Sequence, residues 1–241
     1  MVDNSEKIKK LMHWEIEGDV YYVQVMRRIK DGADHEGPVR DFHIHSLEQF
    51  DREYPEMKRL AEINRARVMV RLNQRNTMDA NILTQMDALR TQLEINRVLR
   101  KIKRTGDATL GLPKIQSAHK CYSSALGRCN TEATETRKWC IDIDPDMVDP
   151  NKPGFETLDK IAETFGKFIV DKCGTKDKKT GTVRVPKLYC TLPSKSGLHL
   201  VTSTFAVNIF TNHFGKPKNQ EGYIMEDANE NLYIPDAIYE H

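Results

Sequence analysis

The stretch KWCIDIDPD, at residues 138–146, places three carboxylates at alternate positions after a short apolar run. In a β-strand, residues two apart point to the same face and lie roughly 6.6 Å apart. Desolvated carboxylates this close repel each other, so Asp142 and Asp144 need a cation. Mg²⁺ and Mn²⁺ prefer oxygen ligands, and pairs of such ions drive phosphoryl and nucleotidyl transfer. The spacing therefore indicates a two-metal site, whereas Asp146, after Pro145, is expected in a turn.

The same pair of carboxylates has an explanation without a metal. Arg184 or Lys187, on a neighbouring predicted strand, would neutralise Asp142 and Asp144 directly. An Asp-x-Asp pair is also expected about once by chance in a chain with this much aspartate. The motif alone therefore leaves both interpretations open.

A loop that suits phosphate, PSKSGLH, follows later in the chain. Ser194, Lys195 and Ser196 offer hydroxyls, an ammonium group and backbone N–H groups, all of which bind phosphate oxygens. His199 begins the next predicted strand and would donate a hydrogen bond to phosphate. A lone histidine at a strand start is more often structural, but its position after this loop favours a phosphate-binding role.

Hydrophobic spacing predicts the elements that must position these residues. Alternation predicts strands and spacings of three and four predict helices. The predicted strands are 39–46, 67–73, 137–144, 183–191, 198–205 and 231–235. The predicted helices are 46–66, 77–104, a shorter one containing 118–129, and 155–174. Pro55 is expected to kink or divide the first helix.

These elements predict an α+β protein with one composite domain. We expect an N-terminal α/β unit at residues 1–76, a helical insert at 77–130, and an RRM-like half with a mixed or antiparallel sheet at 131–241. A chain of 241 residues is long enough to bury a substantial core.

The composition predicts a cytoplasmic protein without a membrane partner. The chain has no run of about 18 apolar residues that would span a membrane. Its N-terminus has no apolar segment of a secretory signal. The five cysteines have no framework spacing, so reduced thiols are expected.

The net charge of +2 conceals an uneven distribution. Residues 90–128 contain nine Lys or Arg against two acids, a balance of +7, and residues 221–241 contain six acids and no Lys or Arg. Such separation permits a polyanion-binding face. A solvated helical face explains the basic stretch equally well.

The order of motifs resembles the catalytic core of the archaeo-eukaryotic primase (primase-polymerase) superfamily. The resemblance lies in a strand ending in CIDID, a helix, a strand, and then SGLH leading another strand. PSKSGLHLVT also resembles the Gly-x-x-Gly-x-His stretch of the polymerase domains of bacterial end-joining ligases. The similarity covers residues 136–205 and extends loosely to 40–76, which is similar to small phage and plasmid members. It implies a bacterial or phage-infected host cytoplasm.

This resemblance implies a metal-dependent nucleotidyltransferase that adds nucleotides from nucleoside triphosphates on a DNA or RNA template. Asp142 and Asp144 would bind two Mg²⁺ or Mn²⁺ ions. Ser196 and His199, with Ser194 and Lys195 of the same loop, would hold the triphosphate. Replication proteins such as a helicase would be partners.

The family carries a third acidic position on a later strand. In this sequence only YIMEDANENLYIP offers candidates, Glu226 and Asp227. If neither reaches the metals, a catalytically degenerate nucleotide-binding or nucleic-acid-binding protein is the alternative. A metal-dependent phosphoesterase or nuclease using the same acids is a further alternative.

Three arginines in and after the second predicted strand are candidates for nucleic-acid binding. Arg67 and Arg71 are four apart, so they share one face of a strand, and Arg75 follows just beyond it. Arginine binds phosphate through two parallel hydrogen bonds. We therefore expect these three side chains to contact phosphate or template.

Overall fold

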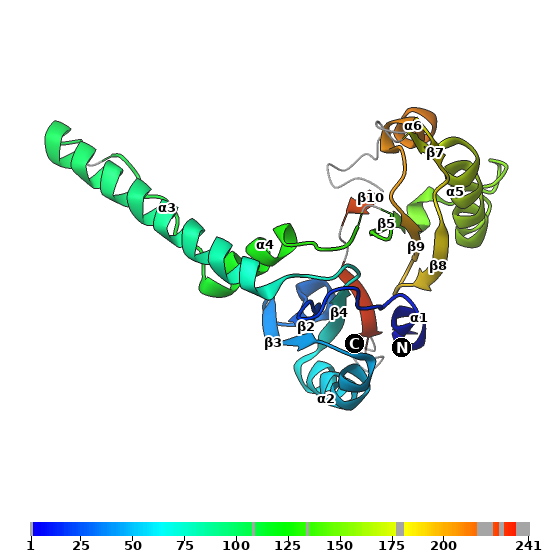
Figure 1. The fold of residues 1–241 in the computed structure, drawn as a ribbon, viewed down its shortest axis with the longest axis horizontal. Coiled ribbons are helices and arrows are strands. Elements are labelled where there is room, and N and C mark those ends of the chain that lie inside the picture. Colours follow the sequence, from blue (N-terminus) through cyan, green and yellow to red (C-terminus); the bar gives the residue numbers. More distant parts are fainter. Residues whose placement is uncertain are drawn as a thin grey trace.

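The computed structural model describes residues 2–107, 109–133, 135–176, 181–215, 224–226 and 229–234. Figure 1 shows two large β-sheets, helices packed against them, and one long helix that projects away from both. A third, small sheet pairs β6 (Thr175–Lys176) with β7 (Val183–Arg184). All hydrogen-bonded strand pairs in the two sheets are antiparallel. The α+β class is confirmed.

The first sheet has five strands. Its order is β1 (Val2–Asp3), β11 (Asn229–Ile234), β4 (Ala66–Arg71), β2 (Tyr21–Arg27) and β3 (Gly37–Ile44). Helix α2 (Leu47–Asn64) connects β3 to β4, and β2 lies between those two strands. The arrangement is a split β-α-β unit. The predicted strands 39–46 and 67–73 and the helix between them are confirmed.

Helix α2 begins at an N-cap, where the Ser46 hydroxyl oxygen accepts a hydrogen bond from the Gln49 backbone N–H at 3.1 Å. Phe50, Met57 and Ala61 are buried against the sheet. The helix continues through Pro55 as a single element, so the expected division into two helices is wrong. Its buried apolar stripe holds it on the sheet although Pro55 donates no backbone hydrogen bond.

Strand β2 was not predicted, although it lies inside the first sheet. Its sequence YYVQVMR does not alternate strictly, because both of its faces are covered. Val23 and Val25 belong to the main core with α2. Tyr22 packs on the other face in a small cluster with Leu126 of the helical insert.

The second sheet has the order β10 (Ile224–Glu226), β5 (Lys138–Ile143), β9 (Leu198–Ser203) and β8 (Leu188–Pro193). Helix α5 (Leu158–Lys172) lies between β5 and β8 in the chain, and α6 (Val207–Phe214) lies between β9 and β10. The chain order is therefore β-α-β-β-α-β with the first and third strands adjacent. This is the RRM-like arrangement that the sequence predicts.

The two halves share more of the chain than the predicted boundaries allow. The last strand, β11, pairs with β4 of the first sheet and not with the sheet of residues 131–241. Leu192 and Val201 of the second sheet lie in the same core cluster as Ile8 of α1 (Ser5–Lys9). The chain thus returns to its first unit at the C-terminal end, which sequence periodicity does not reveal.

A buried polar network joins the two sheets at the start of β5. The Lys138 amine donates to a Glu132 carboxylate oxygen at 2.8 Å, with 2% and 0% of these side chains exposed. The Asn73 side chain accepts from the Lys138 N–H at 2.7 Å and donates to its carbonyl oxygen at 2.9 Å. Burial lowers the pKa of Lys138, although Glu132 opposes this effect. The network fixes β5 to the end of β4.

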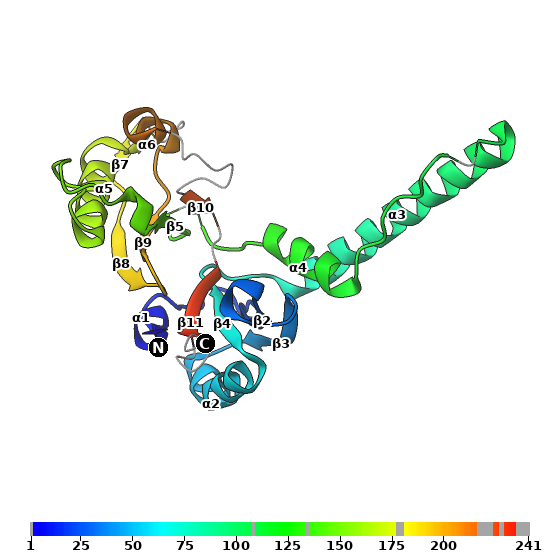
Figure 2. The same cartoon turned by 180° about the vertical axis from the view of Figure 1, so that it is seen from behind.

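The helical insert consists of α3 (Thr77–Thr105) and α4 (Ala118–Arg128), as predicted. Figures 1 and 2 show α3 projecting from the body while α4 returns beside its first turns. Ala80 and Leu126 anchor the two helices against the first sheet.

Helix α3 is long but strongly charged. Among the residues that the structure describes, no helix is both long and apolar enough to cross a membrane.

Candidate active site

Asp142 and His199 lie directly opposite each other on the adjacent strands β5 and β9. The Nε2 atom of His199 is 3.2 Å from a carboxylate oxygen of Asp142. The Asp142 side chain is 37% exposed and that of His199 is 12% exposed. Ile141 and Ile143 point to the other face, where they pack in the core with α5. The predicted alternation along this strand is therefore confirmed.

The turn Ser194–Gly197, which joins β8 to β9, lies against the end of β5. The Ser194 N–H donates to the Gly197 carbonyl oxygen at 2.9 Å. The Gly197 N–H donates to the Ser194 hydroxyl oxygen at 3.0 Å. A β-carbon on Gly197 would meet the Ile143 carbonyl oxygen closer than β-carbons ever approach heavy atoms. The turn therefore lies beside Ile143, within one residue of both predicted metal ligands.

Gly197 is part of the predicted loop but was not among the predicted site residues, although it permits this contact. The available signal was a glycine in a polar turn between two predicted strands, which often marks a close approach of backbones. Lys195 and Ser196 are exposed at the tip of the same turn.

Asp144 and Asp146 occupy different structures after β5. Asp144 is exposed and immediately follows the strand, and its carbonyl oxygen accepts from the Met147 N–H at 3.1 Å. Asp146 lies in a short 3₁₀ helix, Pro145–Met147. The prediction that Asp146 belongs to the turn is confirmed, and Asp144 remains at the strand end beside Asp142.

The predicted third carboxylate is only partly described. Strand β10 does pair with β5, but its register sets Glu226 opposite Trp139. Trp139 is three residues from Asp142, or about 10 Å along the strand. Asp227 lies outside the described residues. In the described part of the chain, no group of three or more His, Cys, Asp or Glu is arranged to hold a metal ion.

The two residues proposed to neutralise the carboxylates without a metal lie elsewhere. Arg184 donates to the Thr204 carbonyl oxygen at 3.2 Å. The Lys187 N–H donates to the Ser203 hydroxyl oxygen at 2.9 Å. Ser203 is four residues from His199 along β9, which is about 13 Å. The partner that the structure gives Asp142 is His199.

The contacts of Arg67 contradict the expectation that this residue binds nucleic acid. Its guanidinium makes two hydrogen bonds to the Asp31 carboxylate, and 7% and 1% of the two side chains are exposed. An arginine committed to a buried carboxylate is not available to phosphate.

Arg71 and Arg75 are also covered. Arg75 is fully buried, its Nη1 donates to the Gln74 carbonyl oxygen at 3.0 Å, and burial lowers its pKa to about 9. Arg71 is four residues from Arg67 on β4 and is half-buried beside α4. A β-carbon on Gly127 of α4 would be 3.8 Å from the Arg71 guanidinium. This face of β4 is therefore not an open binding surface.

No family model, no curated protein and no solved structure matches this chain.

Proposed function

We propose that this chain is a metal-dependent nucleotidyltransferase of primase-polymerase type, which adds nucleotides from nucleoside triphosphates on a nucleic-acid template. One observation supports this most directly: Asp142, His199 and the Ser194–Gly197 turn lie together at one end of the second sheet. The turn brings phosphate-binding groups beside the carboxylates, as a triphosphate site requires.

Asp142 and Asp144 would hold Mg²⁺ or Mn²⁺. Their carboxylate oxygens are the ligand type that these ions prefer. When bound, such ions neutralise phosphate charge and lower the pKa of an attacking hydroxyl. The third ligand, Asp227 or Glu226, stays a prediction.

His199 is placed to orient a phosphate group. It is mostly buried and opposes Leu192 on β8 as well as Asp142 on β5, so neighbours on both sides limit its movement. Its Nε2 atom is 3.2 Å from the Asp142 carboxylate, so it would be close enough to donate a hydrogen bond to a phosphate whose charge is neutralised by an ion held on that carboxylate. Lys195 and Ser196 would add a charge and a hydroxyl from the tip of the turn.

A second candidate is a nucleotide-binding protein on the same fold without catalysis. The observation that favours it is that the described residues supply only two carboxylates at this site, one of them already paired with His199. Binding of triphosphate without turnover would then be its activity.

A single assay separates these functions. The protein is incubated with primed and unprimed DNA or RNA templates, labelled nucleoside triphosphates and Mn²⁺, and products are separated by length. Template-dependent extension that disappears in the double variant Asp142→Asn/Asp144→Asn supports the proposal. Template shortening that needs the same acids indicates a phosphoesterase or nuclease. Triphosphate binding without either product indicates the non-catalytic function.

A further inference from the structure

The distal half of α3, the stretch that includes Arg97, Arg100 and Arg104, carries cations that pair with no acid in the part of the chain that the structure describes. Of the nine basic residues in 90–128, Arg90 and Arg128 both form ion pairs with Asp87. The other seven form no ion pair within the described residues, and all are exposed: Arg97, Arg100, Lys101, Lys103, Arg104, Lys114 and Lys120. Because α3 projects from the body, this charge stands apart from the rest of the protein (Figures 1 and 2).

Several of these cations lie on one continuous face of α3. Residues three or four apart are neighbours on a helix surface. Successive members of one set of residues on α3 are separated only by these spacings: Ile82, Met86, Leu89, Leu93, Arg97, Arg100 and Arg104. Ile82, Leu89 and Leu93 are 50%, 66% and 57% exposed, so the face is open along its length. It is apolar near the body and basic toward the tip.

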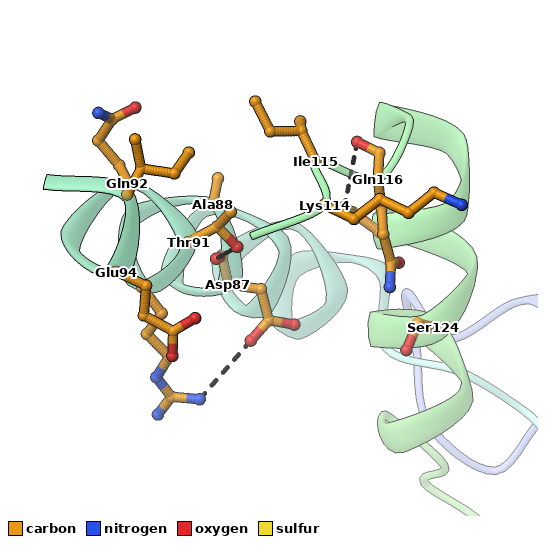
Figure 3. A pocket seen from close by; sticks show the side chains of 12 residues that line it. Asp87, Ala88, Thr91, Gln92, Glu94, Lys114, Ile115, Gln116 and Ser124 are labelled. Atoms are coloured by element: carbon orange, nitrogen blue, oxygen red, sulfur yellow. Dashed lines mark hydrogen bonds and ion pairs between the residues drawn. The ribbon is translucent and has the colours of Figure 1, made fainter. Parts of the chain in front are cut away.

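The other side of α3 carries acids as well as bases. Figure 3 shows the side chains that line a hollow between α3, residues 114–116 and α4. The volume of this hollow is about 460 Å³. Its lining includes the acids Asp87 and Glu94 as well as Arg90 and Lys114, and Asp87 pairs with Arg90 at 3.6 Å. A small anion would meet these acids there, so the basic surface at the tip is suited to an extended partner.

The chemistry of the basic face fits a phosphate backbone. Arg97 to Arg104 spans about 10 Å of helix, and duplex nucleic acid carries one charge per about 1.7 Å of its axis, so one face meets several phosphates. Residues 94–120 contain no Phe, Tyr or Trp, so this segment offers no ring on which an unpaired base could stack. The partner favoured is therefore a duplex contacted through its backbone.

We propose that the distal half of α3 binds the phosphate backbone of a nucleic-acid duplex, independently of base sequence. The inference extends the proposed function, since the duplex would be the primer–template. The distal half of α3, called the arm below, would then make the phosphate contacts that were expected of Arg67, Arg71 and Arg75.

The test compares two triple variants of the full chain that each lose three positive charges. Arg97→Gln/Arg100→Gln/Arg104→Gln alters the arm, and glutamine preserves helix propensity. Arg40→Gln/Arg52→Gln/Arg59→Gln is the control, since these exposed arginines lie on β3 and α2. Affinity for a fluorescent duplex of random sequence is measured by anisotropy across a range of salt concentrations.

We expect the slope of log affinity against log salt concentration to be smaller in magnitude by about 2 to 3 in the arm variant. Each lost phosphate contact reduces the magnitude of this slope by about 0.9. The control should change this slope by less than about 0.5. Asp142→Asn should bind duplex like the wild type, so loss of catalysis and loss of binding are distinguishable.

An arm variant with the wild-type salt dependence would overturn the inference. The inference would also be overturned if the wild-type protein sediments as a dimer, the Leu89→Asp variant sediments as a monomer, and the two bind duplex with equal affinity. That result would assign the exposed face of α3 to a second copy of the chain.

Discussion

Gly197 lies against the carbonyl oxygen of Ile143, so closely that a β-carbon at residue 197 would overlap it. This contact connects the turn before β9 to the last residue of β5. Because Ile143 lies between Asp142 and Asp144, any displacement of the turn also moves the strand that carries both acids. The turn that we propose to bind phosphate is therefore mechanically coupled to the two carboxylates.

Replacing Gly197 by alanine should destabilise the protein by about 1–3 kcal/mol, because backbone must move to admit the methyl group. Urea unfolding measures this change. Gly111→Ala is the matched control, since nothing lies within 4 Å of its added β-carbon, and it should change the free energy of unfolding by less than about 0.5 kcal/mol. Equal stability of the two variants would show that the turn does not rest on β5.

Arg67→Met should cost about 3–5 kcal/mol, because it leaves the Asp31 carboxylate buried without its partner. The folded protein should keep its affinity for duplex. Arg52→Met removes an exposed arginine, 69% accessible, and should leave stability nearly unchanged. Chemical denaturation measures the stability of both variants, and fluorescence anisotropy measures their affinity for duplex. A stable Arg67→Met protein with weakened duplex binding would instead support the expectation that Arg67 binds nucleic acid.

His43 should make stability depend on pH below neutrality. Burial lowers its pKa from 6.5, while its Nε2 lies 2.9 Å from the Tyr122 hydroxyl of α4. The unfolded chain therefore binds a proton more readily than the folded one. The contribution of neutral His43 is present above pH 6.5 and is lost as pH falls through the lowered folded-state pKa.

Thermal melts at pH 7.5 and 5.0 measure this effect. The difference in melting temperature should be smaller in His43→Gln than in the wild type. His35→Gln, which changes an exposed histidine, should retain the wild-type difference. An unchanged difference in His43→Gln would rule out its role.

Local patterns in the sequence predict β5, α5 and β9 of the second half, whereas α6 and β10 were not predicted. The alternation of Ile141, Asp142 and Ile143 identifies both the strand and its polar face. The glycine and serines before His199 identify the turn. These features are encoded by neighbouring residues, so one sequence is sufficient to find them.

Other features depend on partners far apart in the chain. The burial of Arg67 involves Asp31, 36 residues earlier, and Arg71, which is half-buried, lies beside α4. Strand β11 crosses back to β4 by a pairing that no local pattern specifies. Strand β2 is different, because its run of Tyr and Val is a recognisable strand signal even without alternation.

The proposed chemistry is tested most directly by single replacements at two aspartates four residues apart. Asp142 opposes His199 on the sheet, whereas Asp146 lies in the 3₁₀ turn beyond it. We predict that Asp142→Asn lowers the Mn²⁺-dependent rate of nucleotide incorporation by about 100-fold or more, which is roughly 2.7 kcal/mol of transition-state stabilisation. Asp146→Asn should remain within about twofold of the wild type. Equal incorporation by the wild type and Asp142→Asn, with both folded, would contradict the assignment of this site.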